Sequence, residues 1–198
     1  MIERVISSVL DENSYIVKID GTVYVIDPGK GAAEFVKKRY GNEEVFVLLT
    51  HSHSDHLIDL PELKIKAIYM HPEERSVFEN PELNFVNYFG MEQSQLSKLK
   101  EFLTDNPGEH WKVIHTPGHT PGSCCYLLCN RYLFAGDTLF ERSIGRTDLP
   151  GGDPEKMENT LRLLKSFLEN NPELVIFPGH GPSTTAARNL KENPFFNF

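Results

Sequence analysis

Residues 45–56 read Val45-Phe46-Val47-Leu48-Leu49-Thr50-His51-Ser52-His53-Ser54-Asp55-His56, an apolar run followed at once by four metal-binding side chains. The apolar run is typical of a buried β-strand. Residues two apart in an extended chain point the same way, so His51 and His53 can bind one ion together. If the chain then turns into a helix, Asp55 and His56 project elsewhere and can bind a second ion. The alternative, an ordinary polar surface loop, has to be weighed against the ligand candidates downstream.

Three further ligand candidates each follow a strand-like run that ends in a small residue or proline. They lie in Pro117-Gly118-His119, Ala135-Gly136-Asp137 and Pro178-Gly179-His180. Functional side chains gather at strand ends because the core fixes the strands while the loops are free to vary. Seven ligands are too many for one tetrahedral zinc ion and suit two ions that share a bridging ligand. The sequence therefore predicts a binuclear metalloenzyme.

The remaining pattern indicates mixed strands and helices in one domain, residues 1–198. Asp20-Gly21 between the apolar runs 15–19 and 23–26 is a strong hairpin signal. Further strands are predicted at 5–9, 110–116, 123–129, 131–135 and 173–177. Helices are predicted at 32–40, at 94–103 with Ser94 as N-cap, and at 154–168 with Asp153 as N-cap. These elements predict an α+β fold with a sheet-on-sheet core flanked by helices.

Composition restricts the partners and the compartment. The net charge is −8, with 20 Lys and Arg against 28 Asp and Glu, and the hydrophobic fraction of 39% is that of a globular protein. Binding to nucleic acid or to an anionic membrane needs a cationic face, so we expect a small-molecule substrate and neither of those partners. We expect a monomer or small homo-oligomer. The chain shows no signal segment and no apolar run of about 20 residues. It contains only three cysteines. These features together favour the cytoplasm.

The ligand motifs resemble the ordered signature of the metallo-β-lactamase superfamily. The matching residues are His51-x-His53-x-Asp55-His56, Gly118-His119, Gly136-Asp137 and Gly179-His180. The resemblance implies a four-layer αββα sandwich with the metals at one edge. It gives His51, His53 and His119 to the first metal, Asp55, His56 and His180 to the second, and makes Asp137 the bridging ligand.

Within this superfamily, residues 136–140 and 143–153 resemble the small hydrolases related to hydroxyacylglutathione hydrolase (glyoxalase II). Only a short stretch follows His180, so we expect the C-terminal helical domain that helps to hold glutathione to be missing. Two positions depart from the pattern: Ile58 replaces a small residue and Arg142 replaces a glycine. Because both lie near the expected site, the shape of the substrate is expected to differ.

The resemblance predicts hydrolysis of a thioester, such as a hydroxyacylglutathione or a relative, by a metal-bridging hydroxide. Two divalent ions, two carboxylates and a hydroxide leave net positive charge for an anionic tetrahedral intermediate. Asp55 is the predicted catalytic residue, which orients the hydroxide while holding its metal. We expect two ions per chain, with zinc favoured and iron or manganese also compatible with His and Asp ligands. The competing hypothesis is a mononuclear-iron oxidoreductase similar to persulfide dioxygenases.

Four further features have two interpretations each. Asp27 is either an acceptor for a ligand imidazole or a turn residue before Pro28. Arg142 and Arg146 either bind an anionic part of the substrate or pair with Asp148 or Asp153. The aromatic-rich residues 83–91 either cover the substrate or belong to the core.

Overall fold

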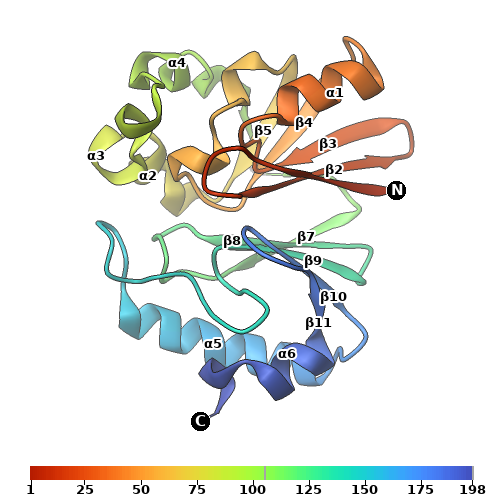
Figure 1. The fold of residues 1–198 in the computed structure, drawn as a ribbon, viewed down its shortest axis with the longest axis vertical. Helices are drawn as coiled ribbons and strands as arrows, with labels where there is room; N and C mark the ends of the chain where they lie inside the picture. Colours follow the sequence, from red (N-terminus) through yellow and green to blue (C-terminus); the bar gives the residue numbers. More distant parts are fainter. Residues whose placement is uncertain (105, 198) are drawn as a thin grey trace. The chain divides into compact units, whose positions relative to one another are not determined.

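The computed structural model describes residues 1–104 and 106–197. The chain divides into two compact units, Met1–Pro107 and Gly108–Phe198, and each contains one β-sheet with helices (Figure 1). The predicted α+β class is therefore confirmed. Within the described residues, no helix combines the length and the apolar character needed to span a bilayer.

The first unit has a six-stranded sheet in which the strands follow one another in chain order. The strands are β1 (Ile2–Ile6), β2 (Asn13–Ile19), β3 (Thr22–Ile26), β4 (Val45–Leu49), β5 (Ile65–Met70) and β6 (Leu103–Thr104). The first three are antiparallel, and the predicted hairpin is β2–β3. From β3 onward the pairing is parallel, so β3, β4 and β5 end at the same edge of the sheet.

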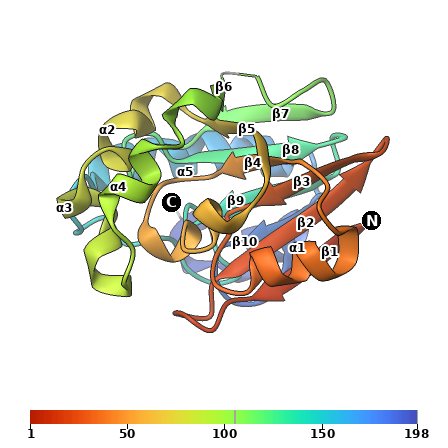
Figure 2. The same cartoon turned by 90° about the horizontal axis from the view of Figure 1, so that it is seen from above.

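Short helices lie over this sheet and beyond the ends of its central strands (Figure 2). They are α1 (Ala32–Tyr40), α2 (Arg75–Phe78), α3 (Pro81–Asn84) and α4 (Gln93–Ser97), with the 3₁₀ turns η1 (Ser54–His56), η2 (Leu60–Glu62), η3 (Pro72–Glu74), η4 (Val86–Phe89) and η5 (Lys100–Phe102). Val36 of α1, Phe78 of α2 and Leu96 of α4 belong to the same buried cluster as Val47 of β4 and Ile68 of β5. Burying each such side chain contributes about 1.5–3 kcal/mol, so the central strands that lead to the site are firmly anchored.

The second unit has a five-stranded sheet in the order β11-β10-β9-β8-β7. Its elements are β7 (Trp111–His115), β8 (Cys124–Leu128), β9 (Tyr132–Gly136), α5 (Pro154–Glu169), β10 (Val175–Pro178), β11 (Thr184–Thr185), α6 (Ala186–Glu192) and the 3₁₀ turn η6 (Pro194–Phe196). Asp153 caps α5 as predicted, since its carboxylate accepts from the amides of Glu155 and Lys156. The stripe Met157, Leu161, Leu164 and Leu168 packs on the sheet.

Two predicted elements are wrong in their bounds. The first strand ends at Ile6 and not at residue 9, because the Ser7 hydroxyl accepts from the amides of Val9 and Lys30, and Leu10 and Asp11 take positive φ angles of 55° and 53°. The helix predicted at 94–103 is α4 followed by a 3₁₀ turn and β6.

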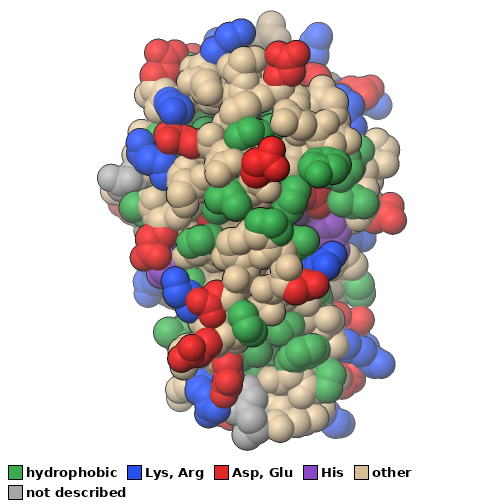
Figure 3. Space-filling view, turned by 90° about the vertical axis from the view of Figure 1, so that its left-hand side faces the viewer, with side chains coloured by type: hydrophobic (Ala, Val, Ile, Leu, Met, Phe, Trp, Pro, Cys, Tyr) green, Lys and Arg blue, Asp and Glu red, His purple; other side chains and the backbone are tan. Residues whose placement is uncertain are grey.

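The N-cap of α4 also differs from the prediction. Glu92, and not Ser94, is the cap, and it forms a capping box with Gln95. Figure 3 shows Lys and Arg side chains interspersed with Asp and Glu side chains over the face it presents.

Candidate metal centre

The first group of predicted ligands follows β4 directly. His51, His53, Asp55 and His56 lie on the segment that leads into the 3₁₀ turn Ser54–His56, and each is at most 8% exposed. The ring centroid of His51 lies 4.8 Å from that of His53 and 4.2 Å from that of His56. The predicted change from extended chain to helical turn is thus present, and it gathers the three imidazoles around His51.

Asp27, at the end of β3, determines which nitrogen of His56 is protonated. Its Oδ2 lies 3.1 Å from Nδ1 of His56. Because a carboxylate can only accept, Nδ1 carries the proton and Nε2 carries the lone pair that a metal needs. The structure therefore supports the interpretation of Asp27 as an acceptor for a ligand imidazole.

The same carboxylate acts on His51 through Thr50. The Thr50 hydroxyl donates to Asp27 Oδ2 at 2.6 Å and lies 3.1 Å from Nδ1 of His51. A hydroxyl has one proton, which is used on Asp27, so the Thr50 oxygen accepts from Nδ1 of His51. Nε2 of His51 is therefore also the lone-pair nitrogen. These bonds explain why Asp27 lies close to His51 and His56. Its carboxylate oxygens accept hydrogen bonds from Thr50 and from Nδ1 of His56, and not from the Nε2 atoms.

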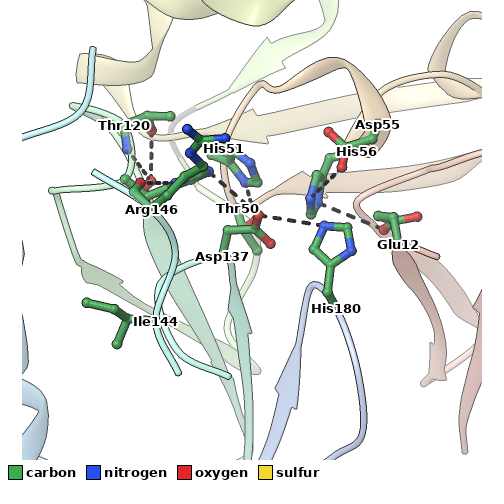
Figure 4. A network of polar contacts seen from close by, with 12 residues as sticks. Glu12, Thr50, His51, Asp55, His56, Thr120, Asp137, Ile144, Arg146 and His180 are labelled. Atoms are coloured by element: carbon green, nitrogen blue, oxygen red, sulfur yellow. Dashed lines mark hydrogen bonds and ion pairs between the residues drawn. The ribbon is translucent and has the colours of Figure 1, made fainter. Parts of the chain in front are cut away.

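Two buried glutamates support this segment and were missed from the sequence. Glu74 Oε1 accepts from the amide of Ser52 at 2.8 Å, which fixes the chain between the first two histidines. Glu12 Oε1 lies 3.9 Å from Nδ1 of His56 (Figure 4). Burial raises the pKa of Glu12 well above its ordinary value, against the opposing effect of His56. Both glutamates lie in charged stretches of sequence that are usually exposed, so no local signal marks them.

The second group of predicted ligands comes from the second unit. β9 and β10 are parallel and pair Gly136 with Pro178, so Asp137 and His180 follow neighbouring strand ends. The amide of Gly179 donates to the carbonyl of Gly136 at 2.8 Å and ties these ends together. Asp137 Oδ2 lies 3.6 Å from Nε2 of His180 (Figure 4).

His119 reaches the same carboxylate from the loop after β7. Its Nε2 lies 3.6 Å from Asp137 Oδ2. Its Nδ1 lies 2.8 Å from the carbonyl oxygen of Arg146, so Nδ1 donates and Nε2 carries the lone pair. A hydrogen bond of 2.9 Å between the hydroxyls of Thr116 and Thr138 joins the two ligand-bearing segments.

The loop after Asp137 is packed closely against both of these ligands. A Cβ on Gly145 would lie 1.8 Å from the carbonyl oxygen of Asp137 and 3.1 Å from Cγ of His119, so only glycine fits there. Buried Asn189 and Asn193 hold the beginning of the same loop through their side-chain amides, which donate to the carbonyls of Phe140, Glu141 and Ser143.

The distances between ligand atoms suit a shared cation. With metal–nitrogen and metal–oxygen bonds of about 2.0–2.1 Å, tetrahedral geometry places two ligand atoms about 3.3–3.4 Å apart. The separation is 3.6 Å for His56 Nε2 and Asp55 Oδ2, and also for Asp137 Oδ2 with each of its two histidines. The donor set of neutral imidazoles and carboxylates is one that Zn²⁺, Fe²⁺ and Mn²⁺ accept. The residues present therefore fit a divalent metal.

The structure favours the ion-pair interpretation of the two arginines. Arg146 makes two bonds of 2.8 Å to Asp148, whose pKa is lowered to about 2 chiefly by this side-chain hydrogen bond. Arg142 pairs with Glu192 at 2.6 Å, a partner that the sequence did not suggest. Asp153 is used as the cap of α5.

The sequence is similar to that of known proteins along most of its length. Residues 8–180 match the family model of the metallo-β-lactamase superfamily. A probable metallo-hydrolase from Streptococcus pyogenes is 31% identical over 99% of this chain and 90% of its own length. Hydroxyacylglutathione hydrolase GloC from Haemophilus influenzae is 32% identical over 87% of this chain and 86% of its own length.

Solved structures agree in fold. A B3 metallo-β-lactamase, BLEG-1, aligns with a TM-score of 0.77 and 30% identity over the whole of both chains. TTHA1623, crystallised in a di-iron-bound form, aligns with a TM-score of 0.75 and 31% identity over 98% of this chain and 99% of that one. ETHE1 from Myxococcus xanthus, with 21% identity over 98% of this chain and 83% of that one, has a TM-score of 0.69 and is similar in fold.

Proposed function

The chain belongs to the metallo-β-lactamase superfamily, and on that premise we propose that it is a binuclear metal-dependent hydrolase that cleaves thioesters. In this proposal the first metal is held by His51, His53 and His119, and the second by Asp55, His56 and His180. Asp137 bridges the two metals. The superfamily match spans all seven of these positions.

One observation carries the binuclear part of the proposal. A single oxygen of Asp137, Oδ2, lies 3.6 Å from Nε2 of His119 and 3.6 Å from Nε2 of His180. Because the proposal assigns His119 to the first metal and His180 to the second, a carboxylate oxygen close to both histidines is suited to bridge two cations roughly 3.5–4 Å apart. The lone-pair nitrogen of His119 is set by Arg146 and faces this oxygen.

The hydrolytic part of the proposal depends on charge and on solvent. When bound, two divalent ions lower the pKa of a shared water to about 7 and polarise an acyl carbonyl. Asp55 lies 3.6 Å from Nε2 of His56, and its side chain is 11% exposed. A carboxylate in that position both holds a metal and accepts a hydrogen bond from the attacking water, which orients that water toward the acyl carbon.

The substrate class comes from a relative. GloC, 32% identical, is named a hydroxyacylglutathione hydrolase, and a hydroxyacylglutathione is a thioester. A thiolate is a good leaving group, so a thioester suits attack by the water that bound metals would activate. β-Lactams are the competing substrate class, because BLEG-1 is described as a B3 metallo-β-lactamase.

The experiment combines a substrate panel with metal analysis. The zinc-, iron- and manganese-loaded proteins are assayed without oxygen on S-lactoylglutathione, an N-acetylcysteamine thioester and nitrocefin. We expect two metals per chain and anaerobic thioester hydrolysis, with nitrocefin turned over far more slowly. Nitrocefin hydrolysis without thioester hydrolysis would overturn the thioester assignment. One iron per chain with oxygen uptake on a persulfide would overturn the hydrolase assignment in favour of the mononuclear-iron oxidoreductase.

A further inference from the structure

The backbone at Phe85 takes a strained conformation. Phe85 has φ 61° and ψ 20°, a left-handed conformation that bulky residues rarely adopt. Such strain costs on the order of 1–3 kcal/mol and persists only where the surroundings enforce it. Helices commonly end on a residue of this conformation, but that residue is usually glycine.

Asn84 enforces this conformation. Its side chain is fully buried, its Nδ2 donates to Phe78 O and Gln93 Oε1, and its Oδ1 accepts from the amide of Val86. Val86 is buried as well. With both neighbours held in the core, the chain can only reverse its direction at Phe85, which keeps that side chain out of the core of helices and sheet.

The Phe85 ring is directed instead to a predicted metal ligand. Its centroid lies 5.3 Å from that of the His53 imidazole, and the ring of Tyr88 lies 6.0 Å beyond it in an edge-on arrangement. Tyr88 is 78% exposed and the adjacent Phe89 is 37% exposed. An aromatic row, Phe85 and Tyr88, thus runs from the side of a ligand histidine into solvent.

We propose that this aromatic row is an apolar subsite that binds the acyl group of the substrate. The inference rests on the proposed function. The row of Phe85 and Tyr88 beside His53 carries no charge, so it suits an apolar acyl group better than a charged thiol part such as glutathione. Phe and Tyr side chains offer large apolar area with little conformational entropy to lose. The subsite therefore favours thioesters with an aryl or long alkyl acyl group over those with a small or charged one.

This assignment divides the segment 83–91 into residues of the core and residues that contact substrate. Val86 and Met91 belong to the core. For these two residues, the interpretation of the segment as part of the core is therefore correct. Phe85 and Tyr88 lie outside that core and are available to substrate. Phe85 is the N-cap of the 3₁₀ turn Val86–Phe89, and Tyr88 lies three residues further along it. Side chains three apart in such a turn face the same way, which accounts for the spacing of the row.

Phe85→Gly gives a sharp test because glycine accepts the left-handed conformation without strain. The variant removes the ring, leaves the site residues in place and should retain cooperative thermal unfolding. Its kcat/KM ratio for phenylacetyl- over acetyl-N-acetylcysteamine is expected to fall by about tenfold or more, since even one methylene in an apolar site changes this ratio by about 10–200-fold. Tyr88→Ala should lower it less. Phe195→Ala, which removes a 43% exposed ring elsewhere, should leave it unchanged.

A second readout separates this inference from the proposed function. In the zinc-loaded protein, 2-phenylacetamide should shift the NMR signals of Tyr88 and His53, acetamide should not, and Phe85→Gly should abolish the shifts. If these shifts appear while thioesters are not hydrolysed, the subsite stands and the thioesterase assignment fails. If phenylacetamide shifts neither signal, or Phe85→Gly keeps the wild-type ratio of kcat/KM, the subsite is overturned.

Discussion

The carboxylate of Asp27 lies 3.1 Å from Nδ1 of His56 and, through the hydroxyl of Thr50, also determines the tautomer of His51. Asp27, which lies outside the predicted ligand set, thereby leaves Nε2 of both histidines as the lone-pair nitrogen. It does so from the end of β3, next to the parallel strand β4 that carries the ligands. Asp27 has a positive φ of 49°, and a Cβ on Gly29 would lie 1.9 Å from Oε2 of Glu12 and 2.9 Å from the backbone oxygen of Asp55, so the turn that places the carboxylate is closely packed.

Asp27→Asn should weaken metal binding without removing a ligand. An amide keeps the size of the carboxylate but presents a donor to at least one of the groups that now donate to it. Loss of such a supporting bond typically lowers metal affinity by about 10–100-fold. Chelator competition measures the change. Asp20→Asn is the matched control, since Asp20 has a similar φ of 46° in an exposed hairpin turn, and an equal affinity for both variants would contradict the role of Asp27.

Gly145→Ala should damage both the stability and the metal site of the second unit. The new Cβ would meet the carbonyl oxygen of Asp137 at 1.8 Å, so the loop or the ligand has to move. Overpacking of this kind costs about 1–3 kcal/mol or more. Gly21 has a positive φ but open space around it, so Gly21→Ala should lower the free energy of unfolding by only about 1 kcal/mol. Denaturant unfolding and metal affinity are the measurements, and wild-type affinity in Gly145→Ala would refute the close packing.

Tyr40→Phe should lose stability in a pH-dependent way. The Tyr40 hydroxyl donates to Glu3 at 2.6 Å and is the main cause of the lowered pKa of Glu3. A depressed folded-state pKa contributes stability that is present above the unfolded value of 4.5 and is lost as the pH falls through the folded value.

The free energy of unfolding should therefore differ between wild type and Tyr40→Phe by about 1 kcal/mol at pH 7, the usual contribution of one hydrogen bond. The difference should shrink toward zero as the pH falls well below 4.5. Tyr88→Phe, which removes the hydroxyl of a residue that is 78% exposed, should show no such pH dependence. A difference for Tyr40→Phe that stays constant from pH 7 to pH 3 would contradict this prediction.

The cap of α5 and the turn after β4 could be predicted because they are local. The segment after β4 contains its own strand, turn and ligand candidates, and α5 begins at Asp153 because one carboxylate caps the amides that follow it. The helix predicted at 94–103 was wrong beyond α4 because it rested on the apolar spacing of Leu96, Leu99 and Leu103 alone. The same spacing fits a helix, yet Leu103 pairs with Ile68 of β5, a long-range contact that periodicity does not contain.

The supporting residues of the site were harder to predict because long-range contacts place them. Glu12 and Glu74 are placed by the pairing of β2 with β3 and by the turn after β5, and only that placement makes them buried. Asp27 was an open alternative, because Asp before Pro suits a turn as well as a hydrogen bond to histidine. Its role became clear only from the positions of Thr50 and His56.

The central claim is that Asp137 serves two metals, and the metal content of Asp137→Ala tests it most directly. Wild type and Asp148→Ala, which removes an exposed carboxylate of the same unit, should each bind two divalent ions per chain by elemental analysis and native mass spectrometry. Asp137→Ala should lose both ions after dialysis, together with thioester hydrolysis. If Asp137→Ala retained two metals per chain and full thioester turnover, the bridging role of Asp137 would be refuted.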